Sequence, residues 1–227
     1  MSAGTISIWG DSIGKSVTFD ESRNRHIICR DNYEAIFKEL GYELHNYARM
    51  GCTAPMGEKL MTEERMNGGI AVIEFGGNDS DIDWKAVSED PENREHPALV
   101  SIPDFKAALT RMIARARKFH MRPVLVTPLP VAAGRYFEWV SRGLNRERIL
   151  KYLGGSAEYI YRWQERYDIA LMEVAIQEKT ALFDVRSRFL DEKNLNDVMS
   201  LDGIHPNARG YGIIKEAVRE RLATTAI

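Results

Sequence analysis

The sequence predicts an α/β protein with a parallel β-sheet between two layers of helices, a three-layer, doubly wound arrangement. Strand-like runs alternate with helix-like segments along the chain, and this alternation is typical of parallel sheets. Because crossovers between parallel strands are nearly always right-handed, the connecting helices cover both faces of the sheet. The chain shows no internal repeat, low-complexity tract or linker, so we expect one domain spanning residues 1–227.

The amino-terminal half alternates strand, helix, strand, helix and strand in residues 5–9, 32–40, 42–47, 56–65 and 70–75. The first helix carries Ala35, Ile36 and Leu40 on one stripe, and Gly41 is a suitable helix stop. The apolar run that forms the third strand predicts a buried strand.

The carboxy-terminal half continues with helix, strand, helix, strand and helix in residues 104–119, 123–127, 156–177, 181–185 and 210–222. The helix at 104–119 has the most regular amphipathic pattern, because apolar side chains recur along one face. These side chains are Phe105, Leu109, Met112, Ile113 and Ala116.

Three long segments fall outside this alternation: 14–30, 79–103 and 131–145. We expect all three to follow the carboxyl ends of strands, where open α/β sheets bind their ligands. The first is long enough for a hairpin that pairs residues 16–18 with 26–28, and the other two are interpreted as polar or aromatic loops. Ordinary surface decoration is the alternative for each.

Composition limits the class of protein. The 227 residues are 44% hydrophobic and 28% charged, which suffices for a full core, and the net charge of −2 gives no basic footprint for nucleic acid or an anionic membrane. No apolar run reaches membrane-spanning length, and the amino terminus lacks a signal-peptide pattern. Cys29 and Cys52 fit neither a disulfide framework nor a metal site. We therefore expect a cytoplasmic protein without nucleic-acid or membrane partners.

A serine near one end of the chain and an aspartate–histidine pair near the other suggest a catalytic triad. Serine is a poor nucleophile unless a histidine takes its proton and a carboxylate orients that histidine. Asp202 lies three residues before His205 in a Gly-containing turn, so its carboxylate can reach Nδ1 and leave Nε2 facing Ser12. Pro206 disfavours helical geometry at His205, and Asn207 is suited to cap the next helix.

Ser12 directly follows the first predicted strand. We expect a tight turn into a helix here, so that the backbone N–H of Ser12 and the helix dipole favour a developing negative charge. An ordinary turn or helix cap is the alternative for this short motif. The remaining histidines have no comparable partner in the sequence and are interpreted as surface or half-buried residues: His26, His45, His96 and His120.

Two further strand ends carry groups suited to an oxyanion hole. Gly51 follows the second strand and can offer its backbone N–H. Asn78 follows the third strand after Gly76 and Gly77, where the backbone can approach a ligand closely and the amide side chain is a donor. A plain turn is the alternative at both places, since Gly and Asn dominate turns.

In chain order these motifs resemble those of the SGNH hydrolases, also called GDSL esterases or lipases. The four blocks are Gly10-Asp11-Ser12-Ile13, Gly51, Gly77-Asn78-Asp79 and Asp202-Gly203-Ile204-His205-Pro206. The resemblance spans residues 6–210, and its one small departure is Ile13, where leucine is common in the family. It implies a flavodoxin-like α/β/α sandwich with a parallel five-stranded sheet, and ester hydrolysis without a metal or other cofactor.

The resemblance also implies roles for individual residues. Ser12 looks like the nucleophile, His205 like the general base, and Asp202 like the acid that orients it. The backbone N–H groups of Ser12 and Gly51 and the side chain of Asn78 look like the oxyanion hole.

The expected partner is a small-molecule ester, with acetylated carbohydrate as the favoured class. Aromatic faces with flanking polar groups suit a sugar ring, although packing within a long loop is the alternative. The candidate substrate-binding residues are Asp11, Trp84, Tyr136, Phe137 and Trp139. The nearby aspartates Asp79, Asp81 and Asp83 are interpreted as turn residues rather than a cation site.

Two other functions stay open from the sequence. One is an arylesterase or thioesterase on short acyl chains, and the other is a catalytically silent sugar- or acyl-binding module on the same fold. A nucleotide- or flavin-binding protein is disfavoured, because the first turn lacks a Gly-rich phosphate cradle.

Overall fold

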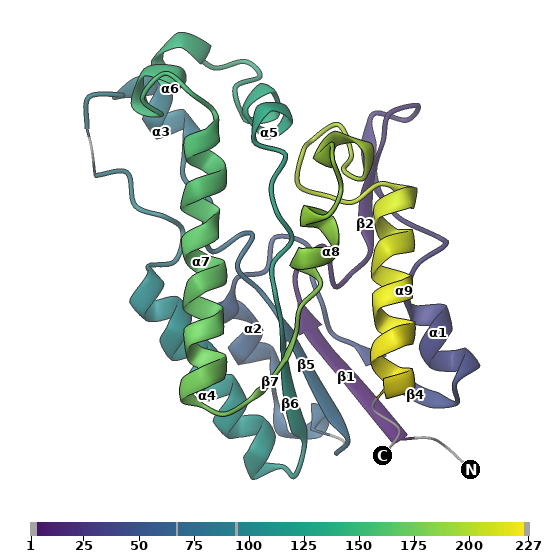
Figure 1. Cartoon of the computed structure of the whole chain (residues 1–227). Coiled ribbons are helices and arrows are strands. Elements are labelled where there is room, and N and C mark those ends of the chain that lie inside the picture. The colour runs from purple at the N-terminus through teal and green to yellow at the C-terminus, as the bar shows by residue number, and fades with distance from the viewer. Residues whose placement is uncertain (1–3, 67, 94, 225–227) are drawn as a thin grey trace.

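The computed structural model describes residues 4–66, 68–93 and 95–224, and its centre is a parallel sheet of five strands (Figure 1). The strands lie in the order β4 (Tyr42–Asn46), β1 (Gly4–Gly10), β5 (Ile70–Glu74), β6 (Arg122–Val126) and β7 (Ala181–Phe183). Every neighbouring pair is parallel. The five predicted strands are confirmed. Their order is the flavodoxin-like one, in which the sheet's second strand in the sequence lies on one side of β1 and all later strands of the sheet lie on the other side.

Helices cover both faces of the sheet, as the sequence predicts (Figure 1). One face packs against α2 (Ala54–Leu60), α4 (Ile102–Lys118) and α7 (Glu158–Gln177), and the other against α1 (Glu34–Glu39) and α9 (Ala208–Thr224). Side chains alternate between the two cores along each strand, so that Ile6 and Ile8 face α1 and α9 whereas Trp9 faces the other layer.

Helix bounds differ from the sequence prediction where local geometry intervenes. The helix expected at 56–65 begins earlier, because Pro55 suits a first helical turn, and it ends at Leu60. A separate 3-10 turn, η1 (Glu63–Arg65), follows it. A short helix, α8 (Arg186–Leu190), and a second 3-10 turn, η2 (Leu195–Asp197), lie between β7 and α9.

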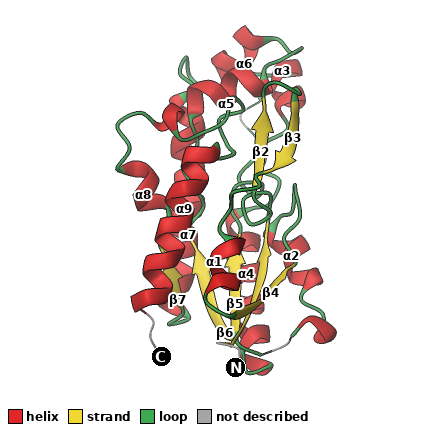
Figure 2. Cartoon of the chain, turned by 90° about the vertical axis from the view of Figure 1, so that its right-hand side faces the viewer, coloured by secondary structure: helices red, strands yellow, loops and turns green. Residues whose placement is uncertain are grey.

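The first long segment forms the predicted hairpin. Strands β2 (Val17–Asp20) and β3 (Arg25–Ile28) pair in antiparallel fashion, with Phe19 opposite His26. Figures 1 and 2 show this hairpin beyond the end of the sheet at which β1 finishes.

The other two long segments contain helices where the sequence predicted loops. These are α3 (Trp84–Glu89) and α5 (Ala133–Val140), followed by α6 (Arg146–Tyr152). Asp83 caps α3 by accepting a hydrogen bond from Ala86 N at 3.0 Å, and α5 buries Tyr136 and Phe137. We call α3, α5 and α6 the helical cap. It has an apolar cluster of its own and lies beyond the same end of the sheet as the hairpin (Figure 2).

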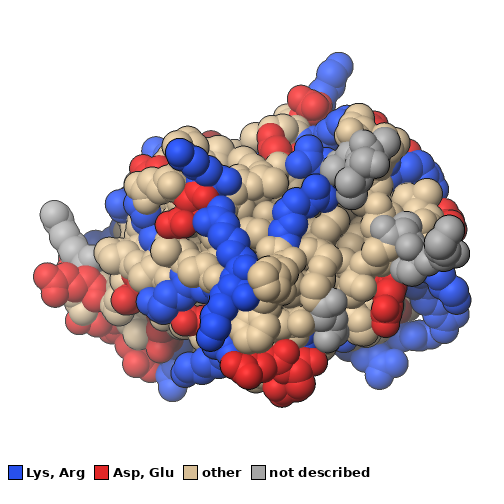
Figure 3. All heavy atoms as spheres, turned by 90° about the horizontal axis from the view of Figure 1, so that it is seen from below, with Lys and Arg blue, Asp and Glu red and all other residues tan. Residues whose placement is uncertain are grey.

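The opposite end of the molecule carries a mixed surface. Figure 3 shows that both positive and negative side chains occur there, in keeping with the small net charge of −2. None of the described helices is long and apolar enough to cross a membrane. A cytoplasmic location and a single domain spanning the chain stay predictions.

Candidate active site

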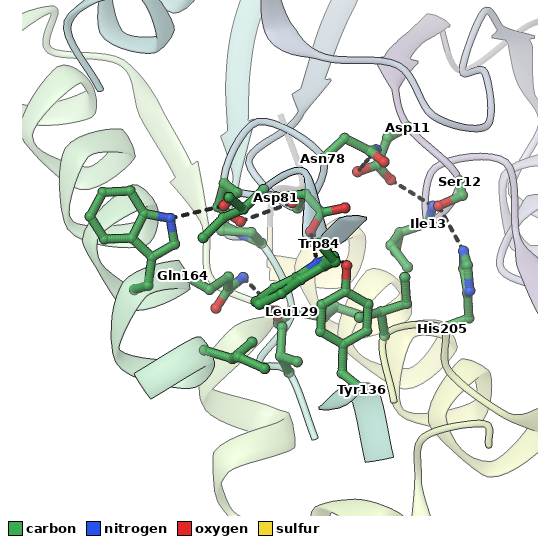
Figure 4. Close-up of a pocket in the computed structure, with 18 of the residues that line it drawn as sticks. Asp11, Ser12, Ile13, Asn78, Asp81, Trp84, Leu129, Tyr136, Gln164 and His205 are labelled. Atoms are coloured by element: carbon green, nitrogen blue, oxygen red, sulfur yellow. Dashed lines mark hydrogen bonds between the residues drawn. The ribbon is translucent and has the colours of Figure 1, made fainter. Parts of the chain in front are cut away.

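Ser12, His205 and Asp202 form a hydrogen-bonded chain beyond the carboxyl ends of the strands. Ser12 Oγ lies 2.9 Å from His205 Nε2 (Figure 4), and His205 Nδ1 lies 2.7 Å from Asp202 Oδ2. The three residues are buried, with exposed fractions of 7%, 3% and 0%. The structure therefore brings together the three residues that the sequence named for a triad.

The loop that carries Asp202 and His205 is fixed by its own backbone. Asp202 Oδ1 accepts hydrogen bonds from Ile204 N at 3.1 Å and His205 N at 3.0 Å, and Ser200 N donates to the carbonyl of His205 at 2.7 Å. Gly203 has a φ of +78°, and a Cβ there would lie 2.5 Å from Tyr136 N. Only glycine fits at this position, because both the conformation and the close approach exclude a side chain.

Residues around the loop behave as the sequence predicts. His205 precedes Pro206 and lies outside α9, which begins at Ala208. Asn207 caps α9, since its Oδ1 accepts a hydrogen bond from Gly210 N at 3.1 Å. The imidazole is thus presented from a short, rigid loop between η2 and α9.

Asp202 is an anion that only accepts hydrogen bonds. Burial alone would raise its pKa, but the hydrogen bonds and charge of His205, with a further hydrogen bond from His26, lower the pKa of Asp202 to about 2. Because an ionised carboxylate has no hydrogen to give, Nδ1 of His205 must be the donor. In the neutral imidazole, Nε2 is then the acceptor for the Ser12 hydroxyl, which is the tautomer that a general base requires.

His26 is a contact of Asp202 that the sequence interpretation missed. His26 is half-buried, one of the two environments that the sequence predicts for it, but the sequence gives it no partner, whereas its Nε2 lies 2.9 Å from Asp202 Oδ2. The hairpin was predictable from local sequence, but the contact between His26 and Asp202 joins residues 176 positions apart. No local pattern marks such a contact.

Ser12 does not begin a helix, which corrects the sequence prediction. The chain passes from β1 through a series of turns into the hairpin: Lys15 N donates to Asp11 O at 3.1 Å, and Val17 N donates to Ser12 O at 2.9 Å. The hairpin takes the place of the expected helix, because Val17 begins a strand that pairs with β3. A helix dipole therefore does not contribute at Ser12.

Asn78 lies beside the nucleophile, but its amide is engaged. Its Nδ2 donates to Asp11 Oδ2 at 3.0 Å and to the carbonyl of Cys52 at 3.2 Å. Gly51, next to Cys52, lies in an exposed turn with a φ of +72° and does not line the pocket described below. To bind an oxyanion, Asn78 has to exchange one of its two present acceptors for the substrate oxygen.

Asp11 and Glu74 form a buried acidic pair under the nucleophile. Glu74 Oε2 accepts from Asp11 N at 3.2 Å and from Gly14 N at 3.1 Å, while Asp11 Oδ1 accepts from Ile13 N at 2.8 Å. Burial, followed by the neighbouring Glu74 carboxyl, raises the pKa of Asp11 well above its usual range, and burial also raises that of Glu74. Asp11 lines the pocket, but its carboxyl is occupied in holding the turn and Asn78.

A pocket extends from Ser12 and His205 under the helical cap (Figure 4). Trp84 and Tyr136, both candidates from the sequence, line it, and each donates a hydrogen bond to Asp81 Oδ1, at 2.8 Å and 2.7 Å. Burial raises the pKa of Asp81 against the lowering effect of these bonds. The sequence interpretation did not include four further lining residues from α7: Tyr159, Ile160, Trp163 and Gln164.

Phe137 and Trp139 do not line this pocket, which corrects their assignment as substrate-binding residues. Phe137 is 3% exposed within the apolar cluster of the cap. Trp139 packs against the hairpin, with its ring centroid 4.7 Å from that of Phe19. Phe137 directly follows Tyr136 on α5, so helical geometry turns it away from the face that Tyr136 presents to the pocket. Trp139 lies three residues after Tyr136 on α5, and its ring is taken up by contacts with Phe19 and His26 of the hairpin.

Among the described residues, one group could hold a metal ion: His26, Asp202 and His205, whose ligand atoms lie within 4.8 Å of one another. A metal ion bound there would replace the hydrogen between His205 Nδ1 and Asp202. These side chains therefore cannot bind a metal ion and act as a triad at the same time. The expectation that the site needs no cofactor stays a prediction.

The sequence matches the model of the GDSL-like lipase/acylhydrolase family over residues 9–213. Because the match covers most of the 227 residues, the chain belongs to this family, which confirms the resemblance to the SGNH hydrolases. It is therefore a carboxylic ester hydrolase of the SGNH type. Comparison with curated proteins gives no match.

Solved structures share the fold at low sequence identity. A lipase/acylhydrolase from Enterococcus faecalis is 17% identical with a TM-score of 0.67, covering 98% of this chain and 95% of that one. A catalytic variant of an acetylxylan esterase from Geobacillus stearothermophilus is 15% identical with a TM-score of 0.64, covering 96% and 94%. The protein TesA is 21% identical with a TM-score of 0.60, covering 96% and 97%. These similarities confirm the predicted fold class.

Proposed function

We propose that this protein is a serine esterase that hydrolyses small acyl esters, with acetyl esters of carbohydrates as its favoured substrates. The observation that carries the proposal is the 2.9 Å contact between Ser12 Oγ and His205 Nε2 at one end of a pocket. Membership of the GDSL-like lipase/acylhydrolase family supports the reaction class.

In the proposed reaction, His205 Nε2 accepts the Ser12 proton as Oγ attacks the ester carbonyl carbon. His205 then gives that proton to the departing alcohol, which leaves the acyl group on Ser12. Water attacks the acyl-enzyme with His205 again as the base, and Ser12 leaves with the proton. Asp202 stays anionic throughout and orients the imidazole, in keeping with the lowering of its pKa to about 2.

The oxyanion formed at each step requires donors in a water-poor site. We assign this role to the backbone N–H of Ser12 and to the amide of Asn78. The family resemblance adds the backbone N–H of Gly51, although Gly51 does not line the pocket. Asn78 releases either Asp11 or the carbonyl of Cys52 when the substrate oxygen enters, since both amide hydrogens are engaged without substrate. Hydrogen bonds in catalytic sites often reach their final geometry only when the substrate is bound.

The walls of the pocket favour a sugar ester. Trp84, Tyr136 and Trp163 offer aromatic surface, while Asp81 and Gln164 add polar atoms beside it. This combination suits a carbohydrate, which has apolar ring faces and hydroxyls at its edge. The acetylxylan esterase with the same fold agrees with this substrate class.

Hydrolysis of p-nitrophenyl acetate tests the reaction and its nucleophile. We expect Ser12→Ala to lower kcat by about four orders of magnitude or more, because residual activity then comes from binding and the oxyanion hole alone. Ser22→Ala is a matched control, since Ser22 is an exposed serine in the hairpin turn. A serine-directed phosphonate should label the wild type and fail to label Ser12→Ala. Retained labelling would place the nucleophile elsewhere, and an inactive wild type would favour a silent binding module.

An arylesterase or thioesterase on short acyl chains is the second candidate. The apolar side chains of Val131, Leu153 and Ile160 in the same pocket favour it, because they suit an aryl or acyl group without hydroxyls. A panel of acyl chain lengths, aryl esters, acyl thioesters and acetylated oligosaccharides separates the two. The sugar ester proposal fails if the oligosaccharides keep their acetyl groups while the aryl esters or thioesters are cleaved.

A further inference from the structure

A second imidazole is bonded to the carboxylate of Asp202. His26 Nε2 lies 2.9 Å from Asp202 Oδ2, the same oxygen that lies 2.7 Å from His205 Nδ1. The other oxygen already accepts two backbone hydrogen bonds, from Ile204 N and His205 N. These four bonds fill the acceptor positions of an ionised carboxylate. Since Asp202 only accepts, His26 must donate through Nε2–H.

The ring of His26 is held by other rings. Its centroid lies 4.9 Å from that of His205, 5.2 Å from that of Phe19 and 5.8 Å from that of Trp139, with interplanar angles of 63° to 70°. The side chain is 25% exposed, so it is neither a free surface residue nor part of the core. Trp139 is itself covered by the Arg142 guanidinium, 4.0 Å from its ring. The ring of His26 thus has a defined place beside the Asp202 carboxylate.

The hairpin that carries His26 is bonded to the chain segments around Asp202. Thr18 Oγ1 lies 3.0 Å from Ser200 Oγ, and Phe19 N donates to the same oxygen at 3.4 Å. The hydroxyl of Tyr211 on α9 donates to the carbonyl of Val17 at 2.7 Å. Because both strands of the hairpin are paired in register, these bonds also fix β3 and His26.

We propose that His26 is a positioning residue of the active site. It holds the Asp202 carboxylate in place, and the carboxylate in turn orients the imidazole of His205. This inference rests on the triad proposed above. His26 does not contact the reacting atoms, and its effect passes through Asp202. Without His26, the carboxylate keeps its backbone bonds on Oδ1 but loses one of the two restraints on Oδ2, and water replaces the lost donor.

Two variants separate the hydrogen bond from the packing of the ring. His26→Phe keeps an aromatic ring beside Phe19 and Trp139 but has no donor, whereas His26→Gln keeps an N–H donor and loses the ring. We expect His26→Phe to lower kcat for p-nitrophenyl acetate about tenfold and to change KM by no more than about twofold. A tenfold loss is near the smallest effect that the loss of a hydrogen bond to a charged group usually has. His26→Gln should recover most of kcat. A wild-type kcat in His26→Phe, or a larger loss in His26→Gln than in His26→Phe, would overturn the proposal.

A double variant tests the route of the effect. If His26 acts through Asp202, His26→Phe should reduce kcat no further in an Asp202→Asn background, whereas independent effects would multiply. A full tenfold further loss in the double variant contradicts the proposal. His45→Phe is the matched control, because His45 is 30% exposed on β4 and contacts Glu43 rather than the triad. It should keep the wild-type kcat.

Ser12→Ala, measured beside these variants, distinguishes the two proposals. An inactive Ser12→Ala with a fully active His26→Phe removes His26 from the mechanism and leaves the proposed function intact. An active Ser12→Ala overturns both. The melting temperature of each variant shows whether a fall in kcat reflects unfolding, and the donor-keeping His26→Gln decides the question if His26→Phe does not fold.

Discussion

The triad residues and the pocket walls meet at one site but are built in different ways. Asp202 and His205 lie on a short loop, where backbone hydrogen bonds and the left-handed Gly203 fix each side chain. The walls above them come from the helical cap and α7, where apolar packing does most of the positioning. Within the cap, Trp84 and Tyr136 each donate a hydrogen bond to Asp81, and these bonds restrain the pocket wall.

This difference predicts a separation of effects. Groups bonded to the reacting atoms change the stabilisation of the transition state, so their loss should reduce kcat for every ester. Groups in the cap contact the remote part of a substrate, so their loss should change the ranking of substrates. The two regions are joined at Gly203, whose carbonyl accepts a hydrogen bond from Ala132 N at 2.9 Å at the start of α5. A change that affected both properties would reveal transmission between the two regions.

After Ser12→Ala, the largest effect on the triad side is expected for Asp202→Asn. An amide at this position can donate to Nδ1 and so favours the wrong imidazole tautomer, which in a serine protease triad lowers kcat by about 10⁴. We expect a similar loss with p-nitrophenyl acetate. Asp197→Asn is a control on exposed η2 and should keep wild-type kcat. A loss below about tenfold in Asp202→Asn would show that the carboxylate does not orient the base.

A smaller effect is expected for Asn78→Ala. Removal of one oxyanion donor lowers turnover by about 10²–10³ in such sites, and KM should change little. Because Asn78 also bonds Asp11 and the carbonyl of Cys52, its melting temperature must be measured with kcat. Wild-type turnover in a folded Asn78→Ala would remove this residue from the oxyanion hole.

The smallest effect on general turnover is expected in the cap. Tyr136→Phe removes the hydroxyl that donates to Asp81 at 2.7 Å and leaves the ring in place. We expect kcat/KM to fall about tenfold for acetylated oligosaccharides, as for a hydrogen bond to a charged group, and to stay within about twofold for p-nitrophenyl acetate. Tyr152→Phe is the control, since Tyr152 lies on α6 and packs edge-to-face against His96 outside the pocket. Equal losses for both substrates would contradict the separation of the two regions.

The parts of the fold that the sequence predicted are those governed by local or periodic patterns. The five strands and the helices on both faces follow from alternation along the chain, and the long connection after Ser12 was correctly expected to contain a hairpin. Helices α3 and α5 were missed, because their apolar residues pack on one another within the cap rather than against the sheet. Their short length left too few turns for a periodic pattern to be recognised.

The same contrast holds for the candidate site. The hydrogen-bonded contacts among Ser12, His205 and Asp202 were predictable, because the chemistry of a triad requires those residue types and the three-residue spacing of the last two permits one turn to hold them. Their catalytic roles stay a proposal. Glu74 and His26 were missed, and Phe137 and Trp139 were wrongly assigned to the pocket. Each of these errors concerns the direction in which a side chain points, which depends on neighbours from distant segments.

The sequence by itself therefore determined the fold class, the family and the residue types for an esterase reaction, because local turns and strand periodicity are encoded by adjacent residues. Only the tertiary structure decided that Ser12 follows a strand without beginning a helix, that Tyr136 faces the pocket while Trp139 faces the hairpin, and that His26 bonds Asp202. The reason is physical: contacts between segments more than a hundred residues apart arise from packing, and no local pattern specifies them.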